Sequence, residues 1–210
     1  AGASAQSSAL TIGGPLGLSI DSAGNIYVAT ALENRVLILP GSPGPARNVV
    51  GQSDFSTRTA NGDVAPLTSS STLSSPSDVK VDQDGNLFIA DSANNRVVAV
   101  PPQSRTANRV WGQGDFTSNG PNQIKPGSID APYKIAIDYS RSPYALYVSD
   151  IANNRILIWQ DSVRFRNGDP ADLVIGHPSL RAGAANVDTQ GSPKPSATSL
   201  SAPAGIAIDP

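Results

Sequence analysis

Acidic and amide side chains alternate at Asp82, Asp84 and Asn86, within the run Asp-Gln-Asp-Gly-Asn. Oxygen-bearing side chains at every second position are typical of the opening of a calcium loop, because Ca²⁺ binds several oxygen ligands at once. An EF-hand loop completes its ligands with a later glutamate and flanking helices, and neither follows here. The matching run at 21–25, Asp-Ser-Ala-Gly-Asn, lacks the second acid. The pattern therefore favours a hairpin turn over a metal site, and we expect no bound metal or cofactor.

A second candidate constellation is an aspartate followed four residues later by an asparagine-arginine pair. A guanidinium that reaches back across a turn to a carboxylate can form a bidentate, charge-assisted hydrogen bond, and the asparagine side chain can cap backbone groups. Because the set recurs once in each repeat, we interpret it as a structural brace rather than a ligand contact. Its members are Asp91, Asn95 and Arg96, then Asp150, Asn154 and Arg155, and the partial set Asn34 and Arg35.

The first copy of this brace lacks its aspartate, because Thr30 occupies that position. We expect Arg35 either to be less constrained than the other two arginines or to pair with another group. Glu33, the sole glutamate of the chain, lies in the same turn.

His177 is the only histidine of the chain, and an imidazole could serve as a general base. It lies in Ile-Gly-His-Pro at 175–178, where the earlier repeats read Val-Gly-Gln-Ser and Trp-Gly-Gln-Gly. It thus replaces Gln52 and Gln113, which favours a role in the loop. With one histidine and one glutamate, the residues present form no convergent catalytic set. We therefore expect the chain not to be an enzyme.

Aromatic and basic residues mark the loops that could contact a partner. Phe55 and Phe116 follow the last strand of a repeat, where an aromatic ring most often fixes the connection onto the sheet. Arg164 and Arg166 flank a phenylalanine between two predicted strands, and two arginines are too few for a nucleic-acid patch. Together with His177, these four residues are the candidates for contact with a partner.

All these residues are positioned by a unit that occurs three times and begins a fourth time. Each copy opens on a proline followed six residues later by an aspartate, at 15–21, 76–82, 132–138 and 203–209. Short runs of aliphatic, aromatic and β-branched residues follow, bounded by Gly, Asn, Asp and Pro, which predicts strands rather than helices. Every unit holds four such runs, and we expect four antiparallel strands in each.

Turn residues separate the first two strands of each unit. Gly24 and Gly85 each precede an asparagine and supply the positive φ that a tight hairpin requires. The third unit has a longer hairpin, with extra residues between Tyr139 and Ala145. The turn between strands two and three should emerge on the same face as the connection to the next unit, so the Asn-Arg turns and the long connections should share one face.

The run Gly-Asn-Leu-Phe-Ile-Ala-Asp-Ser-Ala-Asn-Asn-Arg-Val at 85–97 resembles the NHL repeat, with Asn95-Arg96-Val97 at the position of the family's Asn-His-Leu. The resemblance covers three units and the start of another. It implies an all-β fold, a β-propeller of the NHL type whose blades have four antiparallel strands, and such propellers usually have six blades. The chain departs from the family at Thr30 and in its longer connections.

The repeats divide the chain into three blades, the start of a fourth, and their connections. Because three blades leave open edges, we expect the chain to be part of a longer protein, which the absence of methionine also favours. The expected divisions are a connection at 1–14, a blade at 15–51, a connection at 52–75, a blade at 76–112, a connection at 113–131, a blade at 132–176, a connection at 177–202, and a first strand at 203–210.

Composition and charge exclude several classes of function. The formal net charge is −2 without runs of like charge, which disfavours nucleic-acid binding, including the RNA binding of some NHL proteins. No apolar stretch is long enough for a membrane span. Few lysines and connections rich in Ser, Thr, Gly, Asn and Pro favour an extracytoplasmic bacterial protein, whether secreted, periplasmic or at the cell surface.

The leading hypothesis is a non-enzymatic interaction scaffold that binds a protein or glycan through its loop face. It could be a subunit of a larger assembly and could self-associate through open blade edges. The alternative, implied by the resemblance, is a metal-dependent propeller enzyme of the lactonase or lyase type whose site residues lie outside this sequence.

Overall fold

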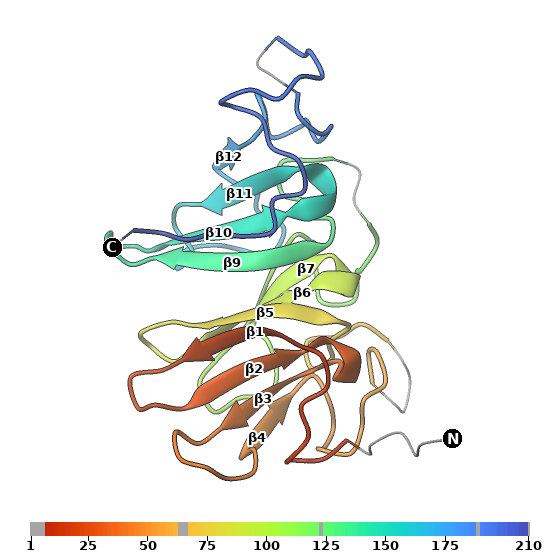
Figure 1. Ribbon diagram of the computed structural model, residues 1–210, viewed down its shortest axis with the longest axis vertical. Coiled ribbons are helices and arrows are strands. Elements are labelled where there is room, and N and C mark those ends of the chain that lie inside the picture. Colours follow the sequence, from red (N-terminus) through yellow and green to blue (C-terminus); the bar gives the residue numbers. More distant parts are fainter. Residues whose placement is uncertain (1–6, 63–66, 122–123, 188–189, 210) are drawn as a thin grey trace.

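The computed structural model describes residues 7–62, 67–121, 124–187 and 190–209. They form three antiparallel sheets of four strands each, in the order of the sequence (Figure 1). The first sheet contains β1 (Pro15–Ile20), β2 (Ile26–Thr30), β3 (Arg35–Leu39) and β4 (Asn48–Val50). The second contains β5 (Pro76–Val81), β6 (Leu87–Asp91), β7 (Arg96–Val100) and β8 (Arg109–Trp111). The third contains β9 (Pro132–Asp138), β10 (Ala145–Asp150), β11 (Arg155–Trp159) and β12 (Leu173–Ile175).

The predicted all-β propeller architecture is confirmed. The first strands, β1, β5 and β9, lie side by side near the middle of the molecule, whereas β4 and β12 lie on opposite sides of them, and the connection after β12 extends beyond it (Figure 1). Within the described residues, no helix is long and apolar enough to cross a membrane. A 3-10 turn joins the second and third strands of each sheet: η1 (Ala31–Glu33), η2 (Ser92–Asn94) and η3 (Ile151–Asn153).

The sheets pack face to face on apolar side chains, because every strand of the central sheet buries residues on both of its faces. Phe88 and Trp111 point toward the third sheet, and Ile89 and Val98 point toward the first. The indole ring of Trp111 tilts against Phe88, with 5.5 Å between ring centroids. The second sheet therefore contributes to both large apolar clusters, because it lies between the other two sheets.

The three inner strands are also joined by polar contacts across the sheets. The Lys134 ammonium in β9 donates to the Leu16 carbonyl of β1 at 2.8 Å and lies 3.8 Å from buried Asp78 of β5. Asp78 in turn accepts from the backbone N–H of Ile135 at 3.0 Å. A single buried carboxylate thus fixes β5 and β9 relative to each other, and the lysine adds β1.

The hairpins turn as their sequences predict. Gly24 and Gly85 have φ values of 83° and 82°, the left-handed region that favours glycine. Asp82 accepts hydrogen bonds from the backbone N–H groups of Asp84 and Asn86, so the calcium-like run is a turn closed on itself. The longer third hairpin lies between the end of β9 and the start of β10, as expected.

The expected first strand at 203–210 is not a strand over 203–209, and Pro210 lies outside the described residues. This segment runs beside the third sheet, where Ser149 Oγ donates to the Pro203 carbonyl. The other three proline segments form strands because each pairs with the strand that follows it. No described residue follows this segment to form that ladder.

A substitution at Gly112 tests the close approach between the end of the second blade and the connection that follows it. Its φ of 90° is in the left-handed region, and an added Cβ would lie 2.9 Å from the Asn95 carbonyl and from Ile129. We expect Gly112→Ala to lower the free energy of unfolding by about 1–3 kcal/mol in urea denaturation. Gly114→Ala is the control, because nothing lies within 4 Å of its added Cβ. Equal effects of the two substitutions would contradict the close approach.

Candidate functional site

The most regular polar constellation lies where the 3-10 turns meet the long connections, which we call the loop end. Each turn closes on an asparagine in the left-handed conformation, Asn34, Asn95 or Asn154, with φ between 52° and 56°. Asparagine tolerates this conformation better than most residues. The next residue in all three sheets is an arginine that begins the third strand.

Arg96 is fully buried and binds three segments of the chain at once. Its Nε donates to Asp91 Oδ2 at 2.7 Å, at the start of the same turn. Its Nη2 donates to the carbonyls of Ser69 and Thr72, both at 2.9 Å, in the connection before the blade. Its Nη1 donates to the Phe116 carbonyl at 2.7 Å, in the connection after the blade. One guanidinium therefore holds two connections against one turn.

Arg155 repeats this arrangement in the third sheet. It donates to Asp150 Oδ2 at 2.6 Å, to the Ser128 carbonyl at 2.9 Å, and to the Leu180 carbonyl at 2.5 Å. Leu180 replaces the phenylalanine of the first two sheets, because only the backbone carbonyl is needed. The aspartates are not bound in the bidentate manner that the sequence suggested. Backbone carbonyls compete for the remaining guanidinium N–H groups.

In the first sheet, Glu33 is the carboxylate that pairs with the arginine, in place of the aspartate found in the other two sheets. Arg35 donates to Glu33 Oε2 through Nε at 3.2 Å and Nη2 at 2.8 Å, while the Thr30 hydroxyl donates to the Arg35 carbonyl. Burial alone would raise the pKa of Glu33, but hydrogen bonds from Ser7 and Arg35 outweigh it and hold that pKa below its usual value. Arg35 is therefore paired elsewhere, one of the two expected outcomes.

Sequence reasoning left Glu33 as an unassigned turn residue, although the repeat contains the signal. Where the first unit has Thr30 and Glu33, the second has Asp91 and Asn94. Asn94 Nδ2 donates to Asp91 Oδ2 at 2.7 Å. The carboxylate and its neutral neighbour have exchanged places within the turn, so each turn keeps one acid facing its arginine.

The buried carboxylates are stabilised by several donors. Burial raises the pKa of the Asp91 carboxyl, and the Arg96 guanidinium with hydrogen bonds from Ser74 and Asn94 opposes that rise. Asp150 has the same balance, with burial raising its pKa. Such a pair tolerates the loss of neither partner, because a lone charge would remain in the interior.

Each of the asparagines Asn34 and Asn95 anchors the following connection at two points, one within it and one at its end. Asn95 Nδ2 donates to the Asn119 carbonyl at 2.9 Å, and Asn95 Oδ1 accepts from the Ala131 N–H at 3.0 Å. Asn34 bonds the Arg58 carbonyl and the Ser75 N–H in the same way. The Asn-Arg turns and the connections thus share one end of the molecule, as predicted.

The third asparagine completes the pattern. Asn154 Nδ2 donates to the Gly183 carbonyl and Oδ1 accepts from the Ala202 N–H, both at 2.9 Å. The connection 177–202 is therefore tied at two points to η3, although residues 188–189 lie outside the described part of the chain.

The two phenylalanines proposed as interaction residues are partly buried. Phe55 packs against a small cluster that includes Leu37 and Val49, and Phe116 packs against the core between the first two sheets. Their carbonyls accept from the buried arginines, so the rings and the backbone hold the connections together.

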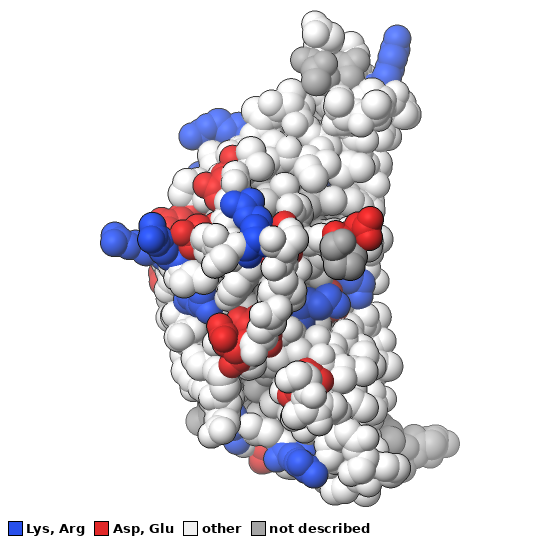
Figure 2. All heavy atoms as spheres, turned by 90° about the vertical axis from the view of Figure 1, so that its left-hand side faces the viewer, with Lys and Arg blue, Asp and Glu red and all other residues white. Residues whose placement is uncertain are grey.

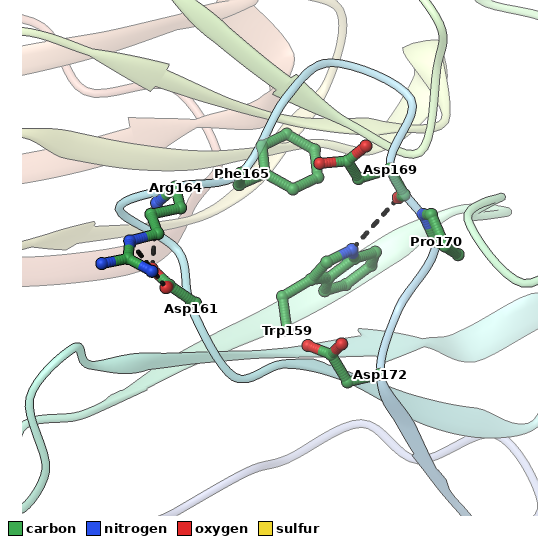
Figure 3. Close-up of a pocket in the computed structure, with 7 residues that line it drawn as sticks. All are labelled: Trp159, Asp161, Arg164, Phe165, Asp169, Pro170 and Asp172. Carbon is green, nitrogen blue, oxygen red and sulfur yellow. Dashed lines mark hydrogen bonds and ion pairs between the residues drawn. The ribbon is translucent and has the colours of Figure 1, made fainter.

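Arg164 and Arg166 lie at the opposite end, where the hairpins turn. Their loop, 160–172, bounds a hollow of about 310 Å³ whose walls include Trp159 and Phe165 (Figure 3). The Arg164 side chain is 89% exposed and lies 3.7 Å from Asp161. The remaining lining residues are Asp169, Pro170 and Asp172.

The loop 160–172 also closes onto the neighbouring sheet. Phe165 stacks on Trp111 with 4.4 Å between ring centroids, and Asn167 Oδ1 accepts from the Val110 N–H of β8 at 3.0 Å. In the second sheet Arg105 has a comparable role, donating to the Val49 carbonyl of β4. The loop 160–172 therefore covers the outer strand, β8, of the sheet before it.

Charge on the hairpin end is mixed. Figure 2 shows Lys and Arg interspersed with Asp and Glu over this face, between wide uncharged areas. Among the described residues, no group of three or more His, Cys, Asp or Glu could hold a metal ion.

Replacing Arg96 tests the brace. Because Asp91 would remain buried without its cation, we expect Arg96→Ala to lower the free energy of unfolding by about 3–5 kcal/mol, measured by urea denaturation. Arg166→Ala is the matched control, since that side chain is exposed, and should change it by less than about 0.5 kcal/mol. A loss below about 1 kcal/mol for Arg96→Ala would contradict the brace.

A second test moves the acid of the second turn from position 91 to position 94, as in the first turn, where the acid is Glu33. Asp91→Thr should destabilise the second blade by about 3 kcal/mol. Adding Asn94→Glu recreates the first turn, and we expect it to restore at least half of that loss. Thr68, whose hydroxyl already lies 3.4 Å from Asn94 Oδ1, is placed to donate to the new carboxylate. A double variant no more stable than Asp91→Thr alone would show that the two turns are not equivalent.

Comparison with known proteins agrees with the fold. Residues 73–99 match the NHL repeat. NHL repeat-containing protein 2 of Bos taurus is 27% identical over 149 residues, which cover 69% of this chain and 20% of that protein. This chain thus spans about a fifth of that curated relative's length.

Two solved structures resemble the fold at low sequence identity. Kuenenia stuttgartiensis hydrazine synthase is 15% identical and superimposes with a TM-score of 0.51, over 79% of this chain and 36% of that chain. Virginiamycin B lyase from Staphylococcus aureus is 12% identical with a TM-score of 0.49, over 88% and 49%. The predicted resemblance is confirmed: residues 73–99 carry an NHL repeat, and the chain folds as consecutive four-stranded antiparallel blades of the β-propeller type.

Proposed function

We propose that the chain is a non-enzymatic interaction scaffold whose loop end binds a protein or glycan. The observation that carries this proposal is the anchoring of each connection by a buried arginine and a left-handed asparagine. Loops fixed before binding lose little conformational entropy when a partner docks, which favours affinity. Recognition residues are typically carried by such loops over a rigid scaffold.

The exposed side chains of the anchored loops are polar and held in place. Asp115 Oδ1 accepts from the N–H groups of Thr117 and Ser118, and hydrogen bonds from Ser118 and Thr117 lower the pKa of Asp115 to about 2. Asp54 makes the same turn with Ser56 and Thr57. Each of these loops presents a fixed carboxylate beside hydroxyl groups, which suits hydrogen bonding to a polar partner.

Apolar side chains at the two end sheets support assembly with further protein. Leu16, Leu18 and Ile20 alternate along β1 and are 44–58% exposed, and Leu173 and Ile175 of β12 are 49% and 47% exposed. Exposed apolar faces of this kind favour association, either with further blades or with another copy. An extracytoplasmic location and the absence of nucleic-acid partners belong to the same proposal, on the basis of composition and charge.

Matched charge reversals at the two ends test the proposal. Arg58→Glu with Arg181→Glu alters exposed residues of the loop end, and Arg141→Glu with Arg166→Glu makes the same change at the hairpin end. Ligands are found by glycan array and by cross-linking in extracts of the source cells, and then titrated against both variants. We expect the loop-end variant to weaken binding about ten-fold or more, and the hairpin-end variant to leave it unchanged.

Two results would contradict the scaffold. One is binding that survives the loop-end change and is lost with the hairpin-end change. The other is a stoichiometric metal in the purified protein together with metal-dependent turnover of a lactone or peptide substrate. Thermal melting of both variants at the wild-type temperature is the control for folding.

A further inference from the structure

One position at the loop end differs chemically between the three blades. The residue after the glycine that follows each fourth strand is Gln52, Gln113 or His177. All three side chains are buried, with 4%, 8% and 7% of their surface exposed. The histidine thus occupies a place that two glutamines share.

The glutamines fasten the connection to the turn. Gln52 Nε2 donates to the carbonyls of Asn34 and Thr59, at 2.9 and 3.0 Å. Gln113 Nε2 donates to those of Asn95 and Gly120, both at 3.1 Å. In each case one amide group joins the left-handed asparagine to the connection, seven residues further along.

His177 makes neither of these contacts. Neither ring nitrogen has a hydrogen-bond partner among the described residues, although the ring is more than nine-tenths buried. The backbone of Asn153 lies near the ring, but neither ring nitrogen forms a hydrogen bond of ordinary geometry with it. Gln52 Oε1 is also buried without a partner, but both glutamines keep two hydrogen bonds from Nε2, whereas the His177 ring has none. A buried polar group without a partner costs about 1–3 kcal/mol, so we expect the third position to be held less firmly than the other two.

The surroundings of His177 oppose a positive charge. Burial lowers the pKa of His177, the nearby Arg155 guanidinium lowers it further, and the Asn153 backbone offsets this only in part. Asp150, the nearest carboxylate on that arginine, already accepts hydrogen bonds from Arg155 and Asn153. Among the described residues, no carboxylate acts on the His177 ring to offset this effect of Arg155.

We propose that His177 is a proton-operated latch for the connection that follows the third blade. The neutral ring fills the glutamine position and keeps residues 177–187 against η3. When the ring takes up a proton, it leaves this position, because the charged form would be buried beside Arg155. The inference concerns the fold alone and does not depend on what the loop end binds.

The direction of the effect follows from linkage. The folded protein holds His177 below the usual histidine pKa of about 6.5, so the contribution to stability is present above that pH. It is lost as the pH falls. Arg155 to Leu180 and Asn154 to Gly183 remain as anchors, so we expect local opening rather than global unfolding.

Hydrogen exchange on the full chain tests the latch, with the two glutamine connections as controls in the same molecule. After correction for intrinsic exchange, we expect opening of 177–187 to change little between pH 7.5 and about 6.5, and to increase by up to about ten-fold between pH 6.5 and 5.5. The segments 52–62 and 113–121 should show no such increase. His177→Gln should remove the pH dependence, and Gln113→His should transfer it to 113–121.

Either of two results would overturn the latch. Equal pH responses of all three connections would show that His177 has no special part. A pH response of 177–187 that persists in His177→Gln would assign it to another group. Thermal melting of both variants confirms that they are folded, and the transfer variant keeps the test decisive if His177→Gln alters the loop in other ways.

Discussion

The buried guanidinium at the start of each third strand is the interaction on which the rest of the structure depends. Arg35, Arg96 and Arg155 are fully buried, and each binds an acid in its own turn and carbonyls in the connections on both sides. The planar guanidinium has five N–H donors in fixed directions and can bond all of these acceptors at once, whereas the lysine ammonium could not reach all of them. The repeat therefore needs arginine there for geometry as much as for charge.

Repetition made much of the fold predictable from the sequence. The proline-to-aspartate spacing, the short apolar runs and the glycines at 24 and 85 led to four-stranded blades with the observed hairpins. The role of Glu33 was less predictable. In the first blade Thr30 stands at the position of Asp91 and Asp150, and the carboxylate that pairs with the arginine comes from Glu33, three residues later. The carbonyl acceptors were also missed, since any residue type can supply them. Only the fold shows that Phe55 and Leu180 have the same role.

The three blades differ mainly in the position of the acid in the turn and in the length of the connection, because the contacts of the arginine and the asparagine are kept despite these changes. Each turn keeps one acid and one arginine while the acid changes position, and each connection keeps its asparagine anchors while its length changes. The glutamine position is the exception, because His177 keeps the burial of Gln52 and Gln113 and loses their hydrogen bonds. Because one chain contains three copies of the unit, the blades can be compared with each other. The contacts that all three share hold the fold together, and a residue that breaks the pattern, such as His177, indicates where one blade behaves differently.

The most direct measurement is hydrogen exchange in Arg96→Lys, which keeps the charge and removes the planar fork. If one guanidinium holds two connections, protection should fall together in 67–75 and 113–121, on either side of the second blade. The segment 177–187, which depends on Arg155, should be unchanged. Protection lost on one side only, or lost evenly over all three blades, would contradict the account.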